Sequence, residues 1–280
     1  MPMPTEFFKM SAAGNDFILF DNRDGGLVAE GLGGFIRRLC ARSMSVGADG
    51  VVVLERSQRA DVRVRFFNPD GGVTFCGNGG RCAARLAYLH GMAPARMVVE
   101  SDRGFHRAEV RGADVSFEMP DPSGFEAGIE IEAAGRRWSG VMVDTGVPHF
   151  VIMLSDPPEG PIDVAGRAIR LHPRFGPAGV NVDFVHTTSA GEHSVRTYER
   201  GVEGETLACA TGCVAAALAL VSVGRSRPPV SISTRSGAVL LVRFEGEPGR
   251  ASGVRVEGEA RLVYVGHLAE EAIIGLGPDP

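Results

Sequence analysis

The chain has very little lysine. Of its 29 basic residues, Lys9 is the single lysine and all the others are arginines. Pyridoxal-phosphate catalysis and other Schiff-base chemistry need a lysine amine. Lys9 lies in a short apolar segment with no phosphate-binding loop beside it. We therefore predict that the protein works without this cofactor.

Long apolar runs and blocks of positive charge are absent as well. The apolar run Val214–Val221 is far too short to span a bilayer, and the N-terminal sequence MPMPTEFFKM does not resemble a secretory signal. The formal net charge is −5, with no basic cluster, which disfavours nucleic acid and anionic membranes as partners. We predict a cytoplasmic protein that binds a small molecule and has no nucleic-acid or membrane partner. We also expect a homodimer, which is the commonest assembly of small cytoplasmic enzymes.

The cysteine count is five, an odd number that disfavours a disulfide framework, so we expect free thiols. The tight Cys-x-x-Cys pair typical of zinc sites is missing, and so are the Gly-x-Gly-x-x-Gly and Walker motifs. We predict no metal and no nucleotide. Glycine is in excess, with 38 of 280 residues, which indicates tight turns or loops whose backbone approaches a ligand closely.

Short runs with alternating or β-branched side chains recur between Gly, Pro and Asp residues, and they predict strands. Examples are Asp61–Phe67, Val141–Asp144, Phe150–Leu154, Val180–Val185, Ser194–Tyr198 and Val239–Phe244. Helical periodicity is rarer and occurs at 35–40, after Gly77, after Ala210 and, more weakly, over Asp163–Leu171. A strand-rich chain with a few helices favours an α+β fold over a doubly wound sheet.

One pattern occurs twice in the chain. A strand (VRVRFF) leads through a polar loop to Cys76 and a helix (RCAARLAYLHG), and a second strand (SVRTY) leads through a polar loop to Cys209 and a helix (CVAAALALVSVG). Each copy places a Cys-x-x-Gly segment at the helix start. We predict two pseudo-symmetric lobes that meet near MPDPSG. The N-terminal lobe is 1–121, completed by 264–280, and the C-terminal lobe is 122–263.

A cysteine at a helix start has a definite chemical use. The helix N-terminus presents unpaired N–H groups and a partial positive charge, which lower the pKa of a thiol and can also hold a carboxylate. If two such units face each other, a substrate carboxylate lies between them with a thiol on either side of its α-carbon. One thiolate and one thiol can then remove a proton from one face and return a proton to the other without a cofactor.

Other interpretations stay open at this point. A buried cysteine is often a small hydrophobic residue, which is our interpretation of Cys40, Cys82 and Cys213, and Cys76 and Cys209 taken singly allow it too. Two-thiol proton transfer at an α-carbon is the reaction of a cofactor-independent epimerase or racemase, and its amino-acid substrate stays open. The alternatives from other classes are a cysteine hydrolase or acyltransferase and a non-catalytic binding protein.

Seven segments, in chain order, carry a family resemblance. They are KMSAAGNDF (9–17), SVGADG (45–50), FNPDG (67–71), CGNGGRC (76–82), TGVPHFV (145–151), GVNVDF (179–184) and YERGVEGETLAC (198–209) with Thr211-Gly212. In these segments the chain resembles the diaminopimelate epimerases, a family of cofactor-independent amino-acid epimerases.

The resemblance implies a fold, a reaction and a site. Each lobe would be a curved, mostly antiparallel sheet around a central helix, with the active site in the cleft between the lobes. The reaction would interconvert LL- and meso-diaminopimelate, for lysine and peptidoglycan precursor synthesis. Cys76 and Cys209 match the two catalytic bases. The implied substrate contacts are Gly77, Asn78, Thr211 and Gly212 at the reacting carboxylate, Asn15 and Glu199 at the reacting amine, and Asn68, Asn181 and Arg200 at the distal end.

Two positions depart from the pattern of some family members, which have Asn where this chain has Val147 and Gln where it has Gly50. The departures bear on substrate affinity and leave the cysteines untouched. His149 is a candidate for tuning the pKa of a thiol, although a packed or solvated histidine fits equally well. We interpret the other histidines as surface residues: His90, His106, His172, His186, His193 and His267.

Overall fold

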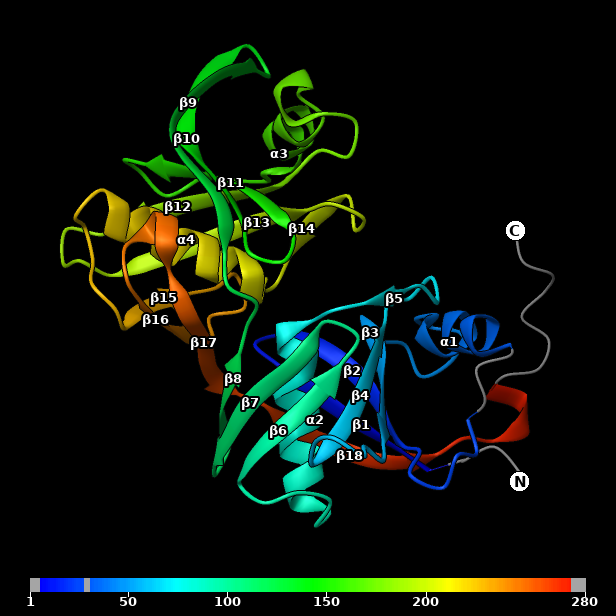
Figure 1. Cartoon of the computed structure of the whole chain (residues 1–280). Coiled ribbons are helices and arrows are strands. Elements are labelled where there is room, and N and C mark those ends of the chain that lie inside the picture. The colour runs from blue at the N-terminus through cyan, green and yellow to red at the C-terminus, as the bar shows by residue number, and fades with distance from the viewer. Residues whose placement is uncertain (1–5, 28–30, 273–280) are drawn as a thin grey trace. The chain divides into compact units, whose positions relative to one another are not determined.

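The computed structural model describes residues 6–27 and 31–272, which form two compact units (Figure 1). Unit 1 contains the chain up to Phe117 and from Glu259 onward, and unit 2 contains Glu118–Gly258. The sequence predicts lobe boundaries after residues 121 and 263. Parts of the predicted N-terminal lobe, residues 1–5, 28–30 and 273–280, lie outside the described residues.

Unit 1 is a mostly antiparallel sheet with two helices. Its strands are β1 (Glu6–Ala12), β2 (Asn15–Asp21), β3 (Gly50–Glu55), β4 (Val62–Phe67), β5 (Val73–Thr74), β6 (Arg96–Ser101), β7 (Gly104–Arg111), β8 (Asp114–Glu118) and β18 (Arg261–His267). Its helices are α1 (Leu32–Cys40) and α2 (Gly77–Leu89), with a 3₁₀ turn at Glu270–Ala272. Strand β2 pairs in parallel with β3, and β4 pairs in parallel with β6.

Unit 2 is likewise built from strands with two helices. Its strands are β9 (Ser123–Ala133), β10 (Arg136–Asp144), β11 (Pro148–Leu154), β12 (Asn181–Thr187), β13 (His193–Glu199), β14 (Gly204–Thr206), β15 (Val230–Ser233), β16 (Val239–Glu245) and β17 (Ser252–Glu259). Its helices are α3 (Asp163–Arg170) and α4 (Ala210–Ser222), with 3₁₀ turns at Pro173–Phe175 and Pro248–Arg250. The strands and helices named from the sequence are present, and the α+β prediction is confirmed.

The order of strand pairings is the same in both units. Strands β1, β2, β3 and β4 pair in sequence, as do β10, β11, β12 and β13, with the second and third of each set in parallel. The parallel pair β4–β6 is matched by β13–β15. The register then equates three pairs of positions: Phe17 with His149, Val52 with Asp183, and Phe66 with Thr197.

Each sheet wraps around one central helix. Helix α2 contacts β1, β2, β3, β4, β7 and β18, and α4 contacts β10, β11, β12, β13, β15 and β16. Small side chains let the strands come close on all sides. At Gly80 in α2, a Cβ atom would lie 2.5 Å from the ring of Phe117. Helix α4 is rich in alanine and is fully buried from Cys213 to Leu220, as expected of a helix that is apolar all round.

The two outer helices are amphipathic and cover the sheets from outside. Leu32, Phe35, Ile36 and Leu39 of α1 are buried in a core cluster with Val51 of β3. In α3, Gly166 allows close contact with Tyr198 of β13, since a Cβ at Gly166 would lie 2.6 Å from that side chain. The helices capped by Cys76 and Cys209, α2 and α4, are therefore the inner elements of the two units.

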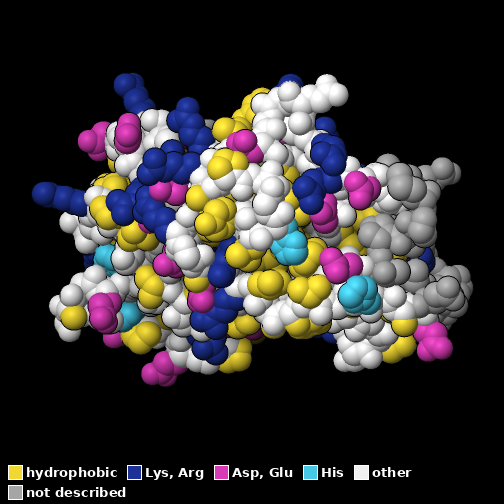
Figure 2. Space-filling view, turned by 90° about the horizontal axis from the view of Figure 1, so that it is seen from below, with side chains coloured by type: hydrophobic (Ala, Val, Ile, Leu, Met, Phe, Trp, Pro, Cys, Tyr) yellow, Lys and Arg dark blue, Asp and Glu magenta, His cyan; other side chains and the backbone are white. Residues whose placement is uncertain are grey.

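No helix within residues 6–27 and 31–272 is long and apolar enough to cross a membrane. The face shown in Figure 2 carries many arginine side chains, and acidic side chains lie among them.

Candidate active site

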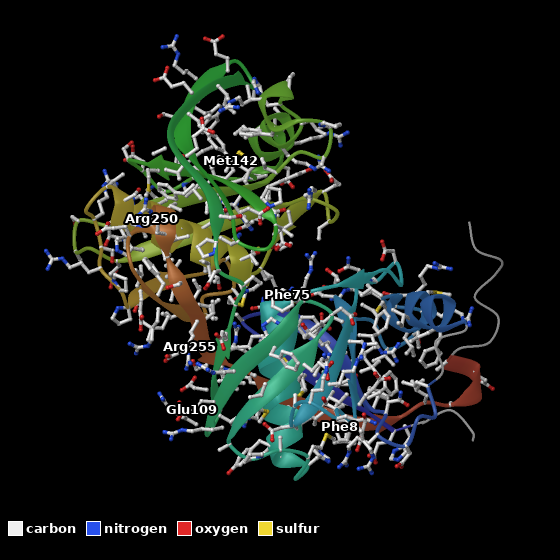
Figure 3. The ribbon with its side chains drawn as sticks, viewed as in Figure 1. Phe8, Phe75, Glu109, Met142, Arg250 and Arg255 are labelled. Carbon is white, nitrogen blue, oxygen red and sulfur yellow. The ribbon has the colours of Figure 1, made fainter. Side chains whose placement is uncertain are left out.

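In unit 1, Cys76 lies at the start of α2. Its backbone is extended, and its Sγ accepts a hydrogen bond from the N–H of Gly79 at 3.4 Å, so the thiol caps the helix. Phe75, labelled in Figure 3, packs against the rings of Phe66 and His106, with ring centroids 5.8 and 5.0 Å away. These contacts anchor the chain immediately before the half-buried Cys76.

The first turn of α2 is linked by side-chain hydrogen bonds to the loop before β3. Asn78 Nδ2 donates to Asn15 Oδ1, and Asn15 Nδ2 donates to Asp49 Oδ2 at 3.0 Å. Asn78 Oδ1 accepts from Arg81 Nη2 at 2.9 Å. The structure thus brings together Asn15 and Asn78, two predicted substrate contacts, beside the Cys76 cap.

Lys9 and Arg42 support this arrangement. Lys9 Nζ is buried, with the carbonyl of Gly47 and the carboxylate of Asp16 as partners, and Arg42 bridges Asp16 and Asp49. Burial acts to raise the pKa of Asp16, but the hydrogen bonds and charges of Arg42 and Lys9 outweigh it and hold that pKa below its usual value. The single lysine is therefore committed to an ion pair.

In unit 2, Cys209 has the same place at the start of α4. Its Sγ accepts from the N–H of Gly212 at 3.4 Å, and its side chain is buried. Cys209 Sγ lies 3.2 Å from Thr211 Oγ1. The two Cys-x-x-Gly segments thus form the same cap in both units, as the repeated pattern predicts.

A buried polar network lies below the Cys209 cap. His149 Nε2 is 3.0 Å from Thr211 Oγ1, and His149 Nδ1 is 2.7 Å from Asp183 Oδ2. Thr197 Oγ1 donates to Asp183 Oδ1 at 2.7 Å. His149 and Asp183 are completely buried. The predicted candidate His149 is therefore connected to Cys209 through Thr211.

The pKa of Cys209 is shifted in the direction opposite to the one that a helix start alone predicts. Burial raises the pKa of this thiol well above its usual value, and the carboxylates of Glu199 and Asp183 raise it further. Hydrogen bonds from Thr211 and the Gly212 N–H act in the predicted direction but are outweighed. The prediction of a lowered pKa is wrong for Cys209, because the cap lies inside the unit rather than at its surface.

Glu199 is the second group next to Cys209. Burial raises the pKa of its carboxyl, whereas hydrogen bonds from Thr206 and Cys209 lower it. Both neighbouring groups have a raised pKa, so two negative charges side by side are disfavoured here. Cys209 is therefore held as a neutral thiol.

The residues predicted to bind the distal end of the substrate belong to different units. Asn68 is exposed in the turn after β4, where its N–H bonds the carbonyl of Gly72 at 2.9 Å. Asn181 is buried, and its Oδ1 accepts from the backbone N–H of Arg200 at 2.7 Å. Asn181 is grouped with His149 in unit 2, and Asn68 belongs to unit 1.

Sequence reasoning missed several residues of the network, chiefly Asp183, Thr197 and Thr206. One signal was present, because GVNVDF places an aspartate within an otherwise apolar strand, and buried carboxylates need partners. Two histidines read as surface residues are buried. His106 bonds Ser101 and stacks on Phe117, and His193 bonds Thr187.

The remaining cysteines are buried, as predicted. Burial raises the pKa of Cys40 and of Cys82 to about 12. Because alkylation requires a thiolate, we expect iodoacetamide at neutral pH to modify the half-buried Cys76 first and to leave Cys40 and Cys82 unmodified in the folded protein. Peptide mass spectrometry over time measures the order, with the urea-unfolded protein as the control. Labelling of Cys40 or Cys82 as fast as Cys76 would contradict this assignment.

Unit 2 also has a cavity of about 300 Å³ between the β10 and α3 regions, lined among others by Arg136, Trp138 and Glu159. It contains neither Cys209 nor His149. The predicted site residues of unit 2 therefore lie outside this cavity.

The family model that matches the chain is described as diaminopimelate epimerase and covers residues 7–123 and 141–262. The diaminopimelate epimerase of Aquifex aeolicus is 39% identical, over 96% of this chain and 99% of that protein. The diaminopimelate epimerase of Chlorobaculum tepidum is 40% identical, over 92% of this chain and 99% of that protein.

Solved structures share the fold at lower identity. A phenazine biosynthesis protein of the PhzF family from Bacillus anthracis has a TM-score of 0.72 at 15% identity and covers 95% of this chain and 99% of that chain. A hydroxyproline epimerase from Agrobacterium vitis has a TM-score of 0.70 at 18% identity and covers 95% of this chain and 92% of that chain. The architecture is thus that of a broader group of proteins, and the sequence identity and the family model together show that the chain belongs to the diaminopimelate epimerase family.

Proposed function

We propose that the protein is a diaminopimelate epimerase, which interconverts LL- and meso-diaminopimelate by proton transfer at one α-carbon, for lysine and peptidoglycan precursor synthesis. The observation that carries the proposal is the repeated cap. In a chain of this family, Cys76 and Cys209 take the same position in two units of the same topology, each at the start of a central helix. No pyridoxal phosphate, metal or nucleotide takes part in the proposed reaction.

Inversion of an α-carbon needs a base on one face and an acid on the other. We assign Cys76 and Cys209 to these two roles, which they exchange when the direction of the reaction is reversed. The negative charge that develops on the carboxylate needs positive partners, and the unpaired N–H groups of a helix start supply them. We assign this role to the first turns of α2 and α4, with Gly77, Asn78, Thr211 and Gly212.

The other predicted contacts bind the two ends of the substrate. We propose that Asn15 and Glu199 hold the reacting amine. Asn15 is oriented by Asp49 and Asn78, and Glu199 by Thr206, which supports this assignment. We assign the distal amino-carboxylate end to Asn68, Asn181 and Arg200, because a guanidinium can grip a carboxylate with two hydrogen bonds. A small apolar substrate would leave these polar groups unpaired.

We also propose that the enzyme is a cytoplasmic homodimer with no nucleic-acid or membrane partner. The net charge of −5 and the absence of a basic cluster in the sequence support the last two statements. Light scattering during size exclusion should give twice the chain mass of 29.6 kDa. A mass equal to one chain would overturn the dimer.

The activity is tested with the purified, reduced protein, LL-diaminopimelate and no added cofactor. We expect chiral chromatography to show meso-diaminopimelate, and the same mixture to be reached from the meso side. Proline and hydroxyproline are the comparison substrates, since proteins that share the fold at low identity carry those names. Turnover of one of them in place of diaminopimelate would overturn the proposed substrate, and no turnover of any would indicate a binding protein.

A further inference from the structure

The turn between β13 and β14 carries two residues of opposite charge, Arg200 and Glu203. They lie three residues apart in a tight turn, which is closed by a hydrogen bond from the Glu203 N–H to the Glu199 carbonyl at 2.8 Å. Glu203 has a positive φ of 58°, and its Oε1 accepts from the N–H of Gly201, the residue after Arg200, at 3.1 Å. The turn therefore folds the Glu203 carboxylate back toward Arg200.

Arg170, the last residue of α3, binds this carboxylate. Its Nε donates to Glu203 Oε1 at 2.8 Å, and the hydroxyl of Tyr198 donates to Oε2 at 3.4 Å. Partial burial acts to raise the pKa of Glu203, but the Gly201 N–H and Arg170 outweigh it and hold this pKa below its usual value. Glu203 is thus charged at neutral pH, and within the described residues its ion pair is with Arg170 and not with Arg200.

The guanidinium of Arg170 is fixed by the loop that leads into β12. Its Nη1 donates to the carbonyl of Ala178 at 3.4 Å, and its side chain is only 13% exposed. Gly179 has a positive φ of 66°, and a Cβ there would lie 2.6 Å from Nη1, so the loop closes directly over the guanidinium. Asn181 follows two residues later and accepts the N–H of Arg200 at 2.7 Å. The Arg170 pair thus lies beside the segments that carry Asn181 and Arg200.

The pairing decides which carboxylate Arg200 can bind. A guanidinium grips one carboxylate with two hydrogen bonds, so a carboxylate of the protein and one of the substrate compete for it. We propose that Arg170 is a positioning residue that keeps the Glu203 carboxylate from pairing with Arg200 and so leaves Arg200 free for the distal carboxylate of the substrate. The charge of Arg170 also offsets that of Glu203, which would otherwise repel the arriving carboxylate. This inference rests on the proposed function in that Arg200 is taken as a contact of the distal carboxylate.

The first kinetic test is Arg170→Gln. Glu203 then loses its cation, and Arg200 of the same turn becomes available to it. We expect KM for LL-diaminopimelate to rise about tenfold, the equivalent of one weakened charge-assisted hydrogen bond. The value of kcat should be unchanged, because Glu199 belongs to β13 and is held by Thr206. A fall in kcat with KM unchanged would overturn the proposal.

The second kinetic test adds Glu203→Gln to Arg170→Gln. A glutamine at this position keeps an oxygen for the Gly201 N–H and has no charge to offer Arg200. We expect the double variant to recover the KM of the unaltered protein, and Glu203→Gln alone to leave KM unchanged. A KM that stays raised in the double variant would show that Arg170 only maintains the shape of the turn. A raised KM in Glu203→Gln alone would show that Glu203 itself binds substrate, and either result would overturn the proposal.

Arg167→Gln is the matched control. It removes the same charge from an exposed residue of α3 and should leave KM unchanged. An equal rise of KM in Arg167→Gln would show that the net charge of unit 2, rather than the Glu203 pair, sets KM, and would overturn the proposal. Circular dichroism and thermal melting establish that each variant is folded.

A crystal structure of Arg170→Gln tests the pairing without turnover. We expect the Glu203 carboxylate to lie within about 4 Å of the Arg200 guanidinium, the spacing of an ion pair. A carboxylate that stays apart from Arg200 would overturn the proposal even if KM rises. If the unaltered protein has no epimerase activity while Glu203 pairs with Arg200 in the variant, the proposed function fails and the role of Arg170 in this pairing remains.

Discussion

Replacing either catalytic thiol by a hydroxyl is expected to abolish epimerisation. In Cys209→Ser and in Cys76→Ser, one face of the α-carbon loses its acid–base group, because a serine hydroxyl is far too weak an acid to replace a thiol. We expect kcat to fall by about 10²–10⁴-fold in each variant. Chiral chromatography of the diaminopimelate isomers measures the loss.

Cys40→Ala and Cys82→Ala are the matched controls for this prediction. Both residues are buried thiols of unit 1 to which the proposed mechanism gives no role, and their raised pKa of about 12 keeps them neutral. Removing one buried sulfur costs stability, but kcat should be retained. Substantial turnover in either Cys76→Ser or Cys209→Ser would show that one base suffices and would refute the two-thiol assignment.

Gly212→Ala is expected to unfold or strongly destabilise unit 2. The added Cβ would lie 2.5 Å from Asp183 Oδ1, and this carboxylate is completely buried and bonded to His149 and Thr197, so it cannot turn away freely. Displacing it breaks charge-assisted hydrogen bonds. After the helix-propensity gain of alanine, the free energy of unfolding should fall by about 2–4 kcal/mol. Urea unfolding measures the change.

Gly79→Ala tests the same substitution at the equivalent position of unit 1. Its Cβ would meet the Phe66 ring at 3.1 and 3.3 Å and Val52 at 3.4 Å, contacts that small side-chain shifts relieve. The helix-propensity gain of about 1 kcal/mol offsets much of the remaining cost, so the free energy of unfolding should change little. Equal destabilisation by the two substitutions would show that the buried carboxylate does not set the cost at Gly212.

Much of the fold was predictable because it depends on local pattern. The helix starts follow from Cys-x-x-Gly before apolar periodicity, and the repeated strand–loop–helix pattern around Cys76 and Cys209 indicates two similar units. The wrapping of a sheet around α4 is consistent with an alanine-rich helix that is apolar on every side. These features need no knowledge of which strands pair.

The network beneath Cys209 was not predictable, because it depends on register between strands far apart in sequence. Asp183 meets His149 only when β11 and β12 pair in parallel, and Thr197 meets Asp183 only in the observed β12–β13 register. The raised pKa of Cys209 was missed for a related reason. A helix start lowers the pKa of a thiol, but the sequence alone does not reveal that this helix start is buried beside Glu199.

The repeat therefore preserves the backbone and changes the chemistry. At the strand positions where unit 1 has Phe17, Val52 and Phe66, unit 2 has His149, Asp183 and Thr197. A reaction that needs one acid and one base at any moment is served by two thiols in unequal surroundings.

The most direct test of the two-thiol account is the fate of deuterium at early times. The reduced protein is incubated with LL-diaminopimelate in D₂O, and NMR follows the α-carbons of substrate and product separately. With two bases, the meso product should carry deuterium at one α-carbon while the remaining LL substrate still carries hydrogen. Product that retains the substrate hydrogen, or deuterium that enters substrate and product equally from the start, would indicate a single base and contradict the account.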